Sequence, residues 1–193
     1  MIDERRDYTV ELSIEERGEA KTPVLVGYAS VFGKTSVDHG GFTEEVARGA
    51  FAETIAKDDV VALVDHEPTR ILGRKSAGTL RLSEDEAGLR MEIDVPDTTI
   101  GRDLVTNVKR GDIKGASFAF RTITDDWRMQ DGKAHRTLIK VTVRDVGPVT
   151  FPAYNDTSVA MRALAQRSEV EQSKTAGRAI RVRKQRQAEA EAS

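Results

Sequence analysis

Apolar residues near the start of the chain recur at every second position, which is the spacing of a strand with one buried face. Residues 8–14 alternate in this way, and residues 24–32 form a second predicted strand that ends at Gly33. Residues 60–64 are a continuous apolar run of strand length, which predicts a short buried strand with His66 just beyond its end. The first third of the chain is therefore predicted to consist largely of strands.

Two further segments in the first half carry recognisable patterns. Residues 42–57 have the spacing of a helix with Thr43 as its N-cap, although a glycine inside a helix, here Gly49, costs about 1 kcal/mol relative to alanine. Residues 79–83 and 89–95 alternate on either side of a turn rich in acidic residues and glycine, which predicts a hairpin with one buried face.

The second half of the globular part repeats the same mixture. Residues 98–110 carry apolar side chains on one helical face, and Gly111 stands where a left-handed C-cap is expected. Two strands, over residues 116–124 and 138–146, flank a turn at Asp131-Gly132. Strands interrupted by helices without regular βαβ alternation predict an α+β fold, with a mostly antiparallel sheet closing into a small barrel and helices flanking it.

Composition divides the 193 residues into two parts. All ten aromatic residues, all five prolines and 14 of the 15 glycines lie before residue 161, whereas residues 161–193 are rich in Ala, Arg, Glu, Gln and Lys. The first part is long enough for one domain with its own core, over residues 1–160. The second part favours helix but forms no continuous apolar stripe, which predicts a charged tail that is helical or disordered. A segment of this kind orders on a partner if it has a docking role.

Charge and residue content exclude several function classes. The net charge is −2, from 30 basic and 32 acidic residues, so no overall basic field favours nucleic acid, and the basic cluster at residues 178–186 lacks stacking aromatics. The absence of cysteine excludes disulfides, thiolate metal sites and cysteine nucleophiles. No signal peptide and no apolar run of the length of a membrane span is present, which predicts a soluble protein without a membrane partner.

Three residues carry candidate chemistry for acyl transfer. Ser117 follows two small residues on a segment that alternates small and aromatic side chains, so it presents a hydroxyl on a strand. A serine hydroxyl becomes nucleophilic when a base takes its proton, and His66 is a candidate for that base. Asp145 lies in an apolar alternation, where a carboxylate needs a partner because burying an unpaired charge is costly. A Ser-His-acid group is recognised by geometry rather than by chain order.

The remaining histidines favour no metal site. His39 lies in a glycine-containing loop and His135 beside a turn, so both are predicted to be exposed. A zinc site built from three scattered histidines would have no local pairing of ligands, and no metal or cofactor is expected. The glycines at Gly40-Gly41 and around Gly111 lack the phosphate-binding fingerprints of nucleotide folds.

A larger set of short motifs, in order along residues 25–160, resembles the prohead maturation protease family of tailed bacteriophages, which is similar in fold and chemistry to the herpesvirus assemblins. The matching segments are residues 27–33, 49–51, 65–68, 72–74, 88–89, 101–103, 111, 115–120, 145–146 and 149–153. The resemblance implies a herpesvirus-protease-like fold over the globular part.

The resemblance also implies roles for the candidate residues. The histidine of the family falls on His66, its nucleophile on Ser117, and an acidic residue before the Val-Thr-Phe-Pro-Ala segment on Asp145. Asp65 remains an alternative third member, although adjacent strand residues point to opposite faces. We also expect a loop at Gly147-Pro148 near the site and Arg121 as a supporting cation.

By resemblance, the expected function is that of a serine endopeptidase in capsid maturation, acting in the host cytoplasm inside the immature prohead. Its substrates would be the scaffolding segment of the major capsid protein or a separate scaffold protein, and the protease itself, with self-association as a dimer as a further possibility. Two alternatives stay open: a catalytically silent assembly protein that binds capsid or scaffold, and a serine esterase. The absence of a Gly-x-Ser-x-Gly elbow around Ser117 counts against the esterase.

Overall fold

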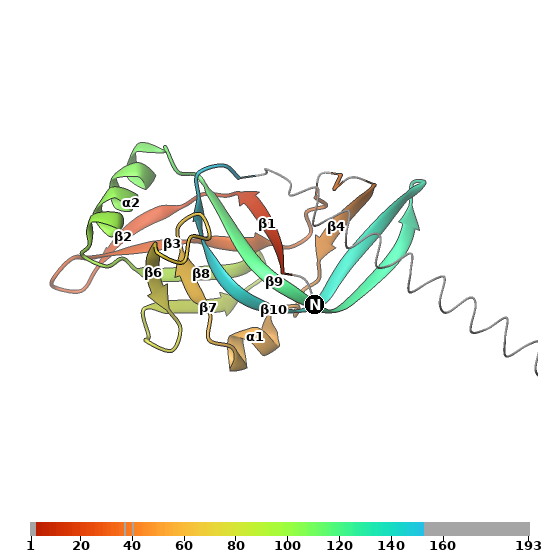
Figure 1. The fold of residues 1–193 in the computed structure, drawn as a ribbon, viewed down its shortest axis with the longest axis horizontal. Coiled ribbons are helices and arrows are strands. Elements are labelled where there is room, and N and C mark those ends of the chain that lie inside the picture. Colours follow the sequence, from red (N-terminus) through yellow and green to blue (C-terminus); the bar gives the residue numbers. More distant parts are fainter. Residues whose placement is uncertain (1–2, 37, 40, 153–193) are drawn as a thin grey trace, which may run out of the picture.

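Two β-sheets and two helices make up the part of the chain that the computed structural model describes, namely residues 3–36, 38–39 and 41–152 (Figure 1). One sheet has the strand order β1-β9-β10-β5-β6, with β4 also paired to β10, and the other has the order β2-β3-β8-β7. The elements are β1 Glu4–Thr9, β2 Ser13–Arg17, β3 Thr22–Val31, β4 Phe42–Val46, α1 Ala52–Lys57, β5 Val61–Leu63, β6 Ile71–Arg74, β7 Leu80–Glu84, β8 Gly88–Asp94, α2 Thr99–Arg110, β9 Gly115–Gln130 and β10 Lys133–Val149.

The mixed α and β content agrees with the predicted class, but the predicted closed barrel is wrong. Each sheet is open, because β1 and β6 end one sheet and β2 and β7 end the other without pairing to each other. Most neighbouring strands are antiparallel, as expected, whereas β4 and β5 both run parallel to β10. The charged helical tail predicted over residues 161–193 lies outside the described residues.

The two sheets share one core rather than closing on themselves. Leu25, Met91 and Ile93 enter it from the four-stranded sheet, and Phe118 and Val141 enter it from the other sheet. The core has few aromatic rings, but these contact one another: Phe51, Phe118 and Phe120 lie with ring centroids 4.7 to 5.4 Å apart.

The predicted helix over residues 42–57 is wrong in its first half. Residues 42–46 form β4, and α1 covers only residues 52–57. Gly49 has φ +85° and turns the chain between the two elements. In β4 every second residue is buried, namely Phe42, Glu44 and Val46. The sequence therefore has the two-residue alternation of a strand, but one of the buried positions is a glutamate, which does not read as apolar.

Other predicted elements are confirmed. The hairpin of β7 and β8 forms as expected, and α2 begins after Thr98, whose hydroxyl accepts a hydrogen bond from the Gly101 N–H at 3.2 Å. Gly111 ends α2 with φ +80°. The single strand predicted over residues 8–14 is instead divided between β1 and β2, which belong to different sheets.

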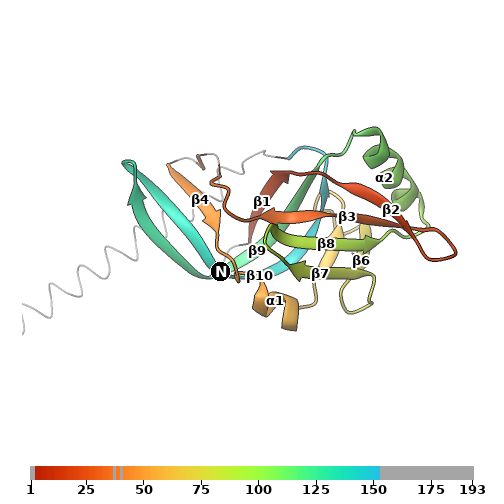
Figure 2. The same ribbon diagram turned by 180° about the vertical axis from the view of Figure 1, so that it is seen from behind.

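The hairpin of β9 and β10 is much longer than predicted and extends beyond the body of the molecule (Figures 1 and 2). It turns at Asp131 and Gly132, both with positive φ, as the sequence of this turn indicates. β4 pairs with the outer part of β10, over residues 134–138, and the inner part of the hairpin lies in the main sheet. β10 therefore contacts β4, β5 and β9 and is the central strand of the fold.

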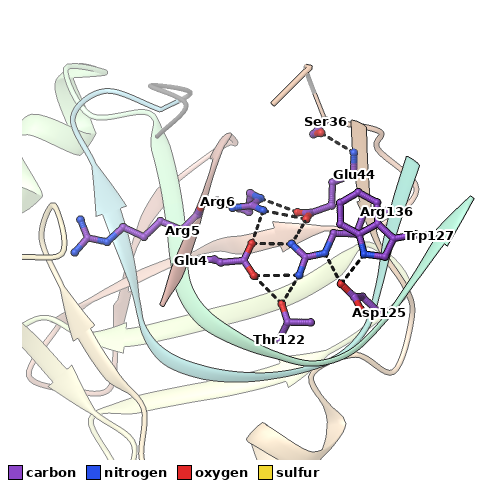
Figure 3. A network of polar contacts seen from close by, with 9 residues as sticks. All are labelled: Glu4, Arg5, Arg6, Ser36, Glu44, Thr122, Asp125, Trp127 and Arg136. Atoms are coloured by element: carbon purple, nitrogen blue, oxygen red, sulfur yellow. Dashed lines mark hydrogen bonds and ion pairs between the residues drawn. The ribbon is translucent and has the colours of Figure 1, made fainter. Parts of the chain in front are cut away.

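A buried ionic network ties β1 and β4 to this hairpin (Figure 3). Arg6 donates to Glu4 and Glu44, and Arg136 donates to the same two carboxylates and to Asp125. Burial alone raises the pKa of the Glu4 carboxyl, but the hydrogen bond and charge of Arg136 and the charge of Arg6 outweigh it and bring the pKa below its usual value. The network thus links β1 through side chains to β4, β9 and β10.

Within the described ranges, no helix is long and apolar enough to cross a membrane.

Candidate active site

Ser117 lies on β9, next to the two strands that flank it. It is in register with Asp7 on β1 and with Gly147 on β10. Successive strand residues point to opposite faces, so Phe118 and Phe120 enter the core while Ser117 and Ala119 lie on the other face. Ser117 is fully buried.

Asp145 reaches the face of Ser117 because β10 contains an irregularity. The register between β10 and β9 shifts between Val143 and Asp145. Val141, Val143 and Val146 all enter the core, so the alternation of buried and outward-facing residues shifts by one residue between Val143 and Val146. Without this shift, the two-residue period would direct Asp145 into the core. The expectation that a carboxylate in this apolar alternation needs a partner is met by the hydrogen bond of Asp145 with His66.

His66 lies in the loop that joins β5 to β6. The loop is closed by backbone hydrogen bonds, from the Val64 N–H to the Arg70 carbonyl at 3.1 Å and from the Glu67 N–H to the Val64 carbonyl at 3.0 Å. Asp65 and His66 both have left-handed backbones, with φ +52° and +58°. Backbones of this kind occur often at functional sites, where surrounding contacts hold them in place.

The structure brings the three candidate side chains together. His66 Nδ1 is hydrogen-bonded to Asp145 Oδ1, and His66 Nε2 lies 2.6 Å from Ser117 Oγ. A carboxylate only accepts hydrogen bonds, so Nδ1 carries the proton and Nε2 is left to accept the one from the serine hydroxyl. The histidine side chain is 7% exposed and that of Asp145 is 16% exposed, so both hydrogen bonds form in a largely dry environment.

This order of groups can move a proton. Nε2 is placed to take the hydroxyl proton of Ser117, and the carboxylate of Asp145 is placed to fix the tautomer of His66 and to stabilise its protonated ring. The three residues come from β9, from β10 and from the loop after β5, so the site depends on the central sheet being assembled.

Asp65 is the alternative acid, but among the residues that the structure describes its carboxylate is not hydrogen-bonded to the His66 imidazole. Its carboxylate instead accepts hydrogen bonds from Thr150 and Arg70. Asp145 is therefore the acid whose geometry suits the third position. Thr150 was not among the candidate residues, and no local pattern in the sequence indicates its contact with a residue 85 positions away.

The loop expected at Gly147-Pro148 is wrong, because both residues lie within β10, and the expected supporting cation, Arg121, is paired elsewhere. Gly147 pairs with Ser117, and a Cβ placed on it would lie 1.9 Å from the Leu63 carbonyl oxygen, so β5 can approach β10 only where this side chain is absent. Arg121 lies four residues beyond Ser117 on β9, but its guanidinium binds Asp3 at 2.5 Å.

The predicted exposure of the other two histidines is wrong. His135 is 1% exposed, with Nδ1 2.9 Å from the Thr43 hydroxyl, and His39 is 6% exposed, with its ring against Phe42. Turn and loop sequences predict exposure, but His135 lies within β10 beside Thr43 of β4, and His39 packs against Phe42 at the start of β4. No three His, Asp or Glu side chains gather as a metal site in the ranges that the structure describes.

The chain matches a family model, a curated relative and a solved structure. Residues 8–174 match the family described as caudovirus prohead serine protease. The chain is similar to the prohead protease of Enterobacteria phage HK97, with 26% identity over 155 residues, which is 78% of this chain and 64% of that protein. The chain thus spans less than two thirds of the length of this curated relative. A solved structure of the bacteriophage T4 capsid assembly protease aligns with 76% of this chain and 98% of that one, at 10% identity and a TM-score of 0.44.

Proposed function

The chain belongs to the caudovirus prohead serine protease family, and we propose that it is a serine endopeptidase with Ser117 as nucleophile, His66 as general base and acid, and Asp145 as the residue that orients His66. The observation that carries this proposal is the continuous hydrogen-bonded series from Asp145 through His66 to Ser117. A buried serine without such a base would be an ordinary strand residue.

In the first half of the proposed reaction, Ser117 Oγ attacks the carbonyl carbon of the scissile peptide bond while His66 Nε2 takes the hydroxyl proton. The imidazolium that forms keeps its Nδ1–H donated to Asp145, which stabilises its charge. As the tetrahedral intermediate collapses, the C–N bond breaks and Nε2 returns its proton to the leaving amine. The products of this half are an acyl ester on Ser117 and a free amine.

In the second half, water replaces the amine. His66 takes a proton from the water, whose oxygen attacks the ester carbonyl, and then returns the proton to Ser117 Oγ as the C–O bond breaks. Each tetrahedral oxyanion requires hydrogen-bond donors, which contribute on the order of 3–4 kcal/mol each in serine proteases. The proposed reaction uses no metal and no cofactor.

The proposed substrates follow from the family. We propose that the protease acts inside the immature prohead in the host cytoplasm, on the scaffolding segment of the major capsid protein or on a separate scaffold protein, and on itself. We assign the peptidase to residues 1–160 and a recruitment role to the charged residues 161–193. The family carries the description prohead serine protease, and the similar protein of phage HK97 is named prohead protease.

The alternative is a catalytically silent assembly protein, and such a protein would have no need of the hydrogen-bonded series from Asp145 through His66 to Ser117. Labelling with a serine-directed phosphonate separates the two functions, because the reagent needs a serine that is activated by a base. We expect mass spectrometry to find a single adduct on Ser117. Ser30, another fully buried strand serine, is the internal control and should remain unlabelled. Absence of an adduct on Ser117 under conditions in which the protein is folded would favour the silent protein.

A further inference from the structure

Asp65 ties the turn that carries His66 to the end of β10. Its carboxylate accepts a hydrogen bond from the Thr150 N–H at 2.7 Å, one from the Thr150 hydroxyl at 3.1 Å and one from Arg70 at 3.2 Å. Its own N–H donates to the Pro148 carbonyl at 3.0 Å. Both the backbone and the side chain of Asp65 are thus fixed to the chain that leaves the central strand.

The backbone of this turn is one that needs to be held. Asp65 and His66 have consecutive left-handed conformations, with φ +52° and +58°. For residues other than glycine, this conformation is disfavoured relative to the right-handed one, and it persists where surrounding contacts determine it. Besides the backbone hydrogen bonds that close the loop, the contacts that hold this turn include those of Asp65 with Thr150, Pro148 and Arg70.

The same segment of chain also reaches the strand of the serine. Gly115, two residues before Ser117, has no room for a side chain, because a Cβ there would lie 2.5 Å from a Pro152 ring atom. Residues 150–152 therefore contact the His66 turn at one end, through Asp65, and the start of β9 at the other. This short segment joins the two elements whose separation decides whether Nε2 reaches Oγ.

We propose that Asp65 is a positioning residue of the peptidase, which clamps the His66 turn to Thr150 and thereby keeps His66 Nε2 within hydrogen-bonding distance of Ser117 Oγ. The inference rests on the proposed role of His66 as the base. It gives the two aspartates different tasks: Asp145 contacts the imidazole and orients the ring, whereas Asp65 sets the path of the backbone that presents the ring.

Two substitutions separate the clamp from the charge. Asp65→Asn keeps one side-chain oxygen to accept from the Thr150 N–H and a residue type that tolerates positive φ. Its NH2 group replaces the oxygen that accepts from the Thr150 hydroxyl and from Arg70, so it can donate to that hydroxyl but loses the ion pair. Asp65→Gly keeps the left-handed backbone but removes every side-chain contact. The matched control is Asp131→Gly, which makes the same change at another left-handed aspartate, with φ +51°, in the turn between β9 and β10.

The activity measurement is hydrolysis of a peptide from the capsid precursor by the full chain. Asp65→Gly should lose about 100-fold in kcat/KM, the size of effect that a displacement of about 1 Å has on catalysis. Asp65→Asn should recover most of that loss, and Asp131→Gly should match the unsubstituted protein. Equal damage in the asparagine and glycine variants, or a loss below about threefold in the glycine variant, would overturn the clamp.

A spectroscopic readout keeps the test independent of the proposed reaction. The proton on His66 Nδ1 that is donated to Asp145 is expected to give a downfield proton resonance, and this signal should weaken or vanish in Asp65→Gly but persist in Asp65→Asn. If the chain hydrolyses no peptide, the proposed function fails while the resonance still tests the clamp. If the resonance is unchanged in Asp65→Gly, the clamp fails while the triad stands.

A milder variant covers the case in which Asp65→Gly does not fold. Thr150→Val removes the hydroxyl that donates to Asp65 and leaves the backbone N–H in place. It should reduce kcat/KM by about fivefold, the equivalent of one ordinary hydrogen bond, with little change in melting temperature. Full activity in Thr150→Val, measured when Asp65→Gly is unfolded, would contradict the clamp.

Discussion

His66 Nε2 lies 2.6 Å from Ser117 Oγ, although the two residues are 51 positions apart. In the sheet, β10 lies between β9, which carries Ser117, and β5, which precedes the His66 loop. The contact is possible because His66 lies in a loop beyond the end of β5, on the face that Ser117 occupies. Asp145, on the strand between them, meets the other nitrogen of the ring. This relationship determines the first two predictions.

Replacing the serine should remove activity without unfolding the protein. Ser117→Ala deletes one hydroxyl, and loss of the nucleophile costs on the order of 10⁶-fold in turnover in a serine protease. The measurement is cleavage of the coexpressed capsid precursor, followed by mass spectrometry of the products. Ser30→Ala is the matched control, because Ser30 is also a fully buried strand serine but lies 3.5 Å from the Tyr8 hydroxyl rather than beside a histidine. Precursor cleavage that persists in Ser117→Ala would remove the serine from the mechanism.

Changing the orienting acid should have a smaller effect than removing the base. His66→Ala should be as inactive as Ser117→Ala, because the two groups act as a unit. Asp145→Asn should retain activity reduced by roughly 10⁴-fold, since the amide favours the wrong tautomer of His66. Steady-state hydrolysis of a peptide substrate measures both. Near-normal rates in Asp145→Asn, together with an inactive Asp65→Asn, would show that the wrong acid has been assigned.

The buried ionic network should contribute more to stability than exposed ion pairs do. Arg136→Ala leaves the buried carboxylates of Glu4 and Glu44 without one of their two arginines, a change that typically costs about 3–5 kcal/mol. Arg81→Ala, on the exposed face of β7, removes ion pairs to Asp94 and Glu92 and should cost no more than about 1 kcal/mol. Urea denaturation of the two variants compares them directly. Similar midpoints would mean that the network adds no more than a surface pair.

Folding stability should fall as the pH is lowered through the mildly acidic range, because of His39. Burial, followed by the positive charge of Arg6, lowers the pKa of this imidazole, against the weaker opposing effects of Glu44, Asp38 and Glu4. When the pH falls below about 6.5, the pKa of a histidine in the unfolded chain, the unfolded chain binds more protons than the folded one, so folding stability decreases. Glu4 stays ionised over this range, since Arg136 and Arg6 hold the pKa of its carboxyl below the usual value.

The test of this pH dependence is urea denaturation at about pH 7.5 and about pH 5. We expect the difference in unfolding free energy between the two pH values to shrink in His39→Gln, which removes the titrating ring. An unchanged difference in that variant would assign the pH dependence to other groups.

The charged segment that follows the described residues should act in recruitment rather than in catalysis. Residues 161–193 contain no aromatic residue and no proline, so the sequence offers little apolar surface for a core. Truncation after about Arg162 should preserve hydrolysis of a peptide substrate but reduce the number of protease copies packaged in each prohead. Quantitative mass spectrometry of purified proheads measures that number, and equal packaging of both proteins would exclude the role.

Local sequence chemistry determined the elements whose signals are short-range. The cap at Thr98, the left-handed Gly111 and the alternation on either side of the β7–β8 turn each depend on neighbours within a few residues, so α2 and that hairpin could be predicted closely. The sequence also singled out Ser117, His66 and Asp145, from residue types suited to acyl transfer and motifs that resemble a known family, and their catalytic roles stay a prediction.

Tertiary structure decided what depends on contacts between distant strands. β4 is a strand because Glu44 is buried against Arg6 and Arg136, and a local pattern assigns a glutamate to the surface. The phase shift before Asp145 also arises from pairing with β9 and cannot be recognised from period-two alternation alone. The contact of Asp65 with Thr150, which distinguishes the two aspartates, joins residues 85 positions apart. The sequence therefore determined which groups are available for the chemistry, and only the assembled sheet decided which of them meet, because hydrogen bonds of this kind require atoms within about 3 Å.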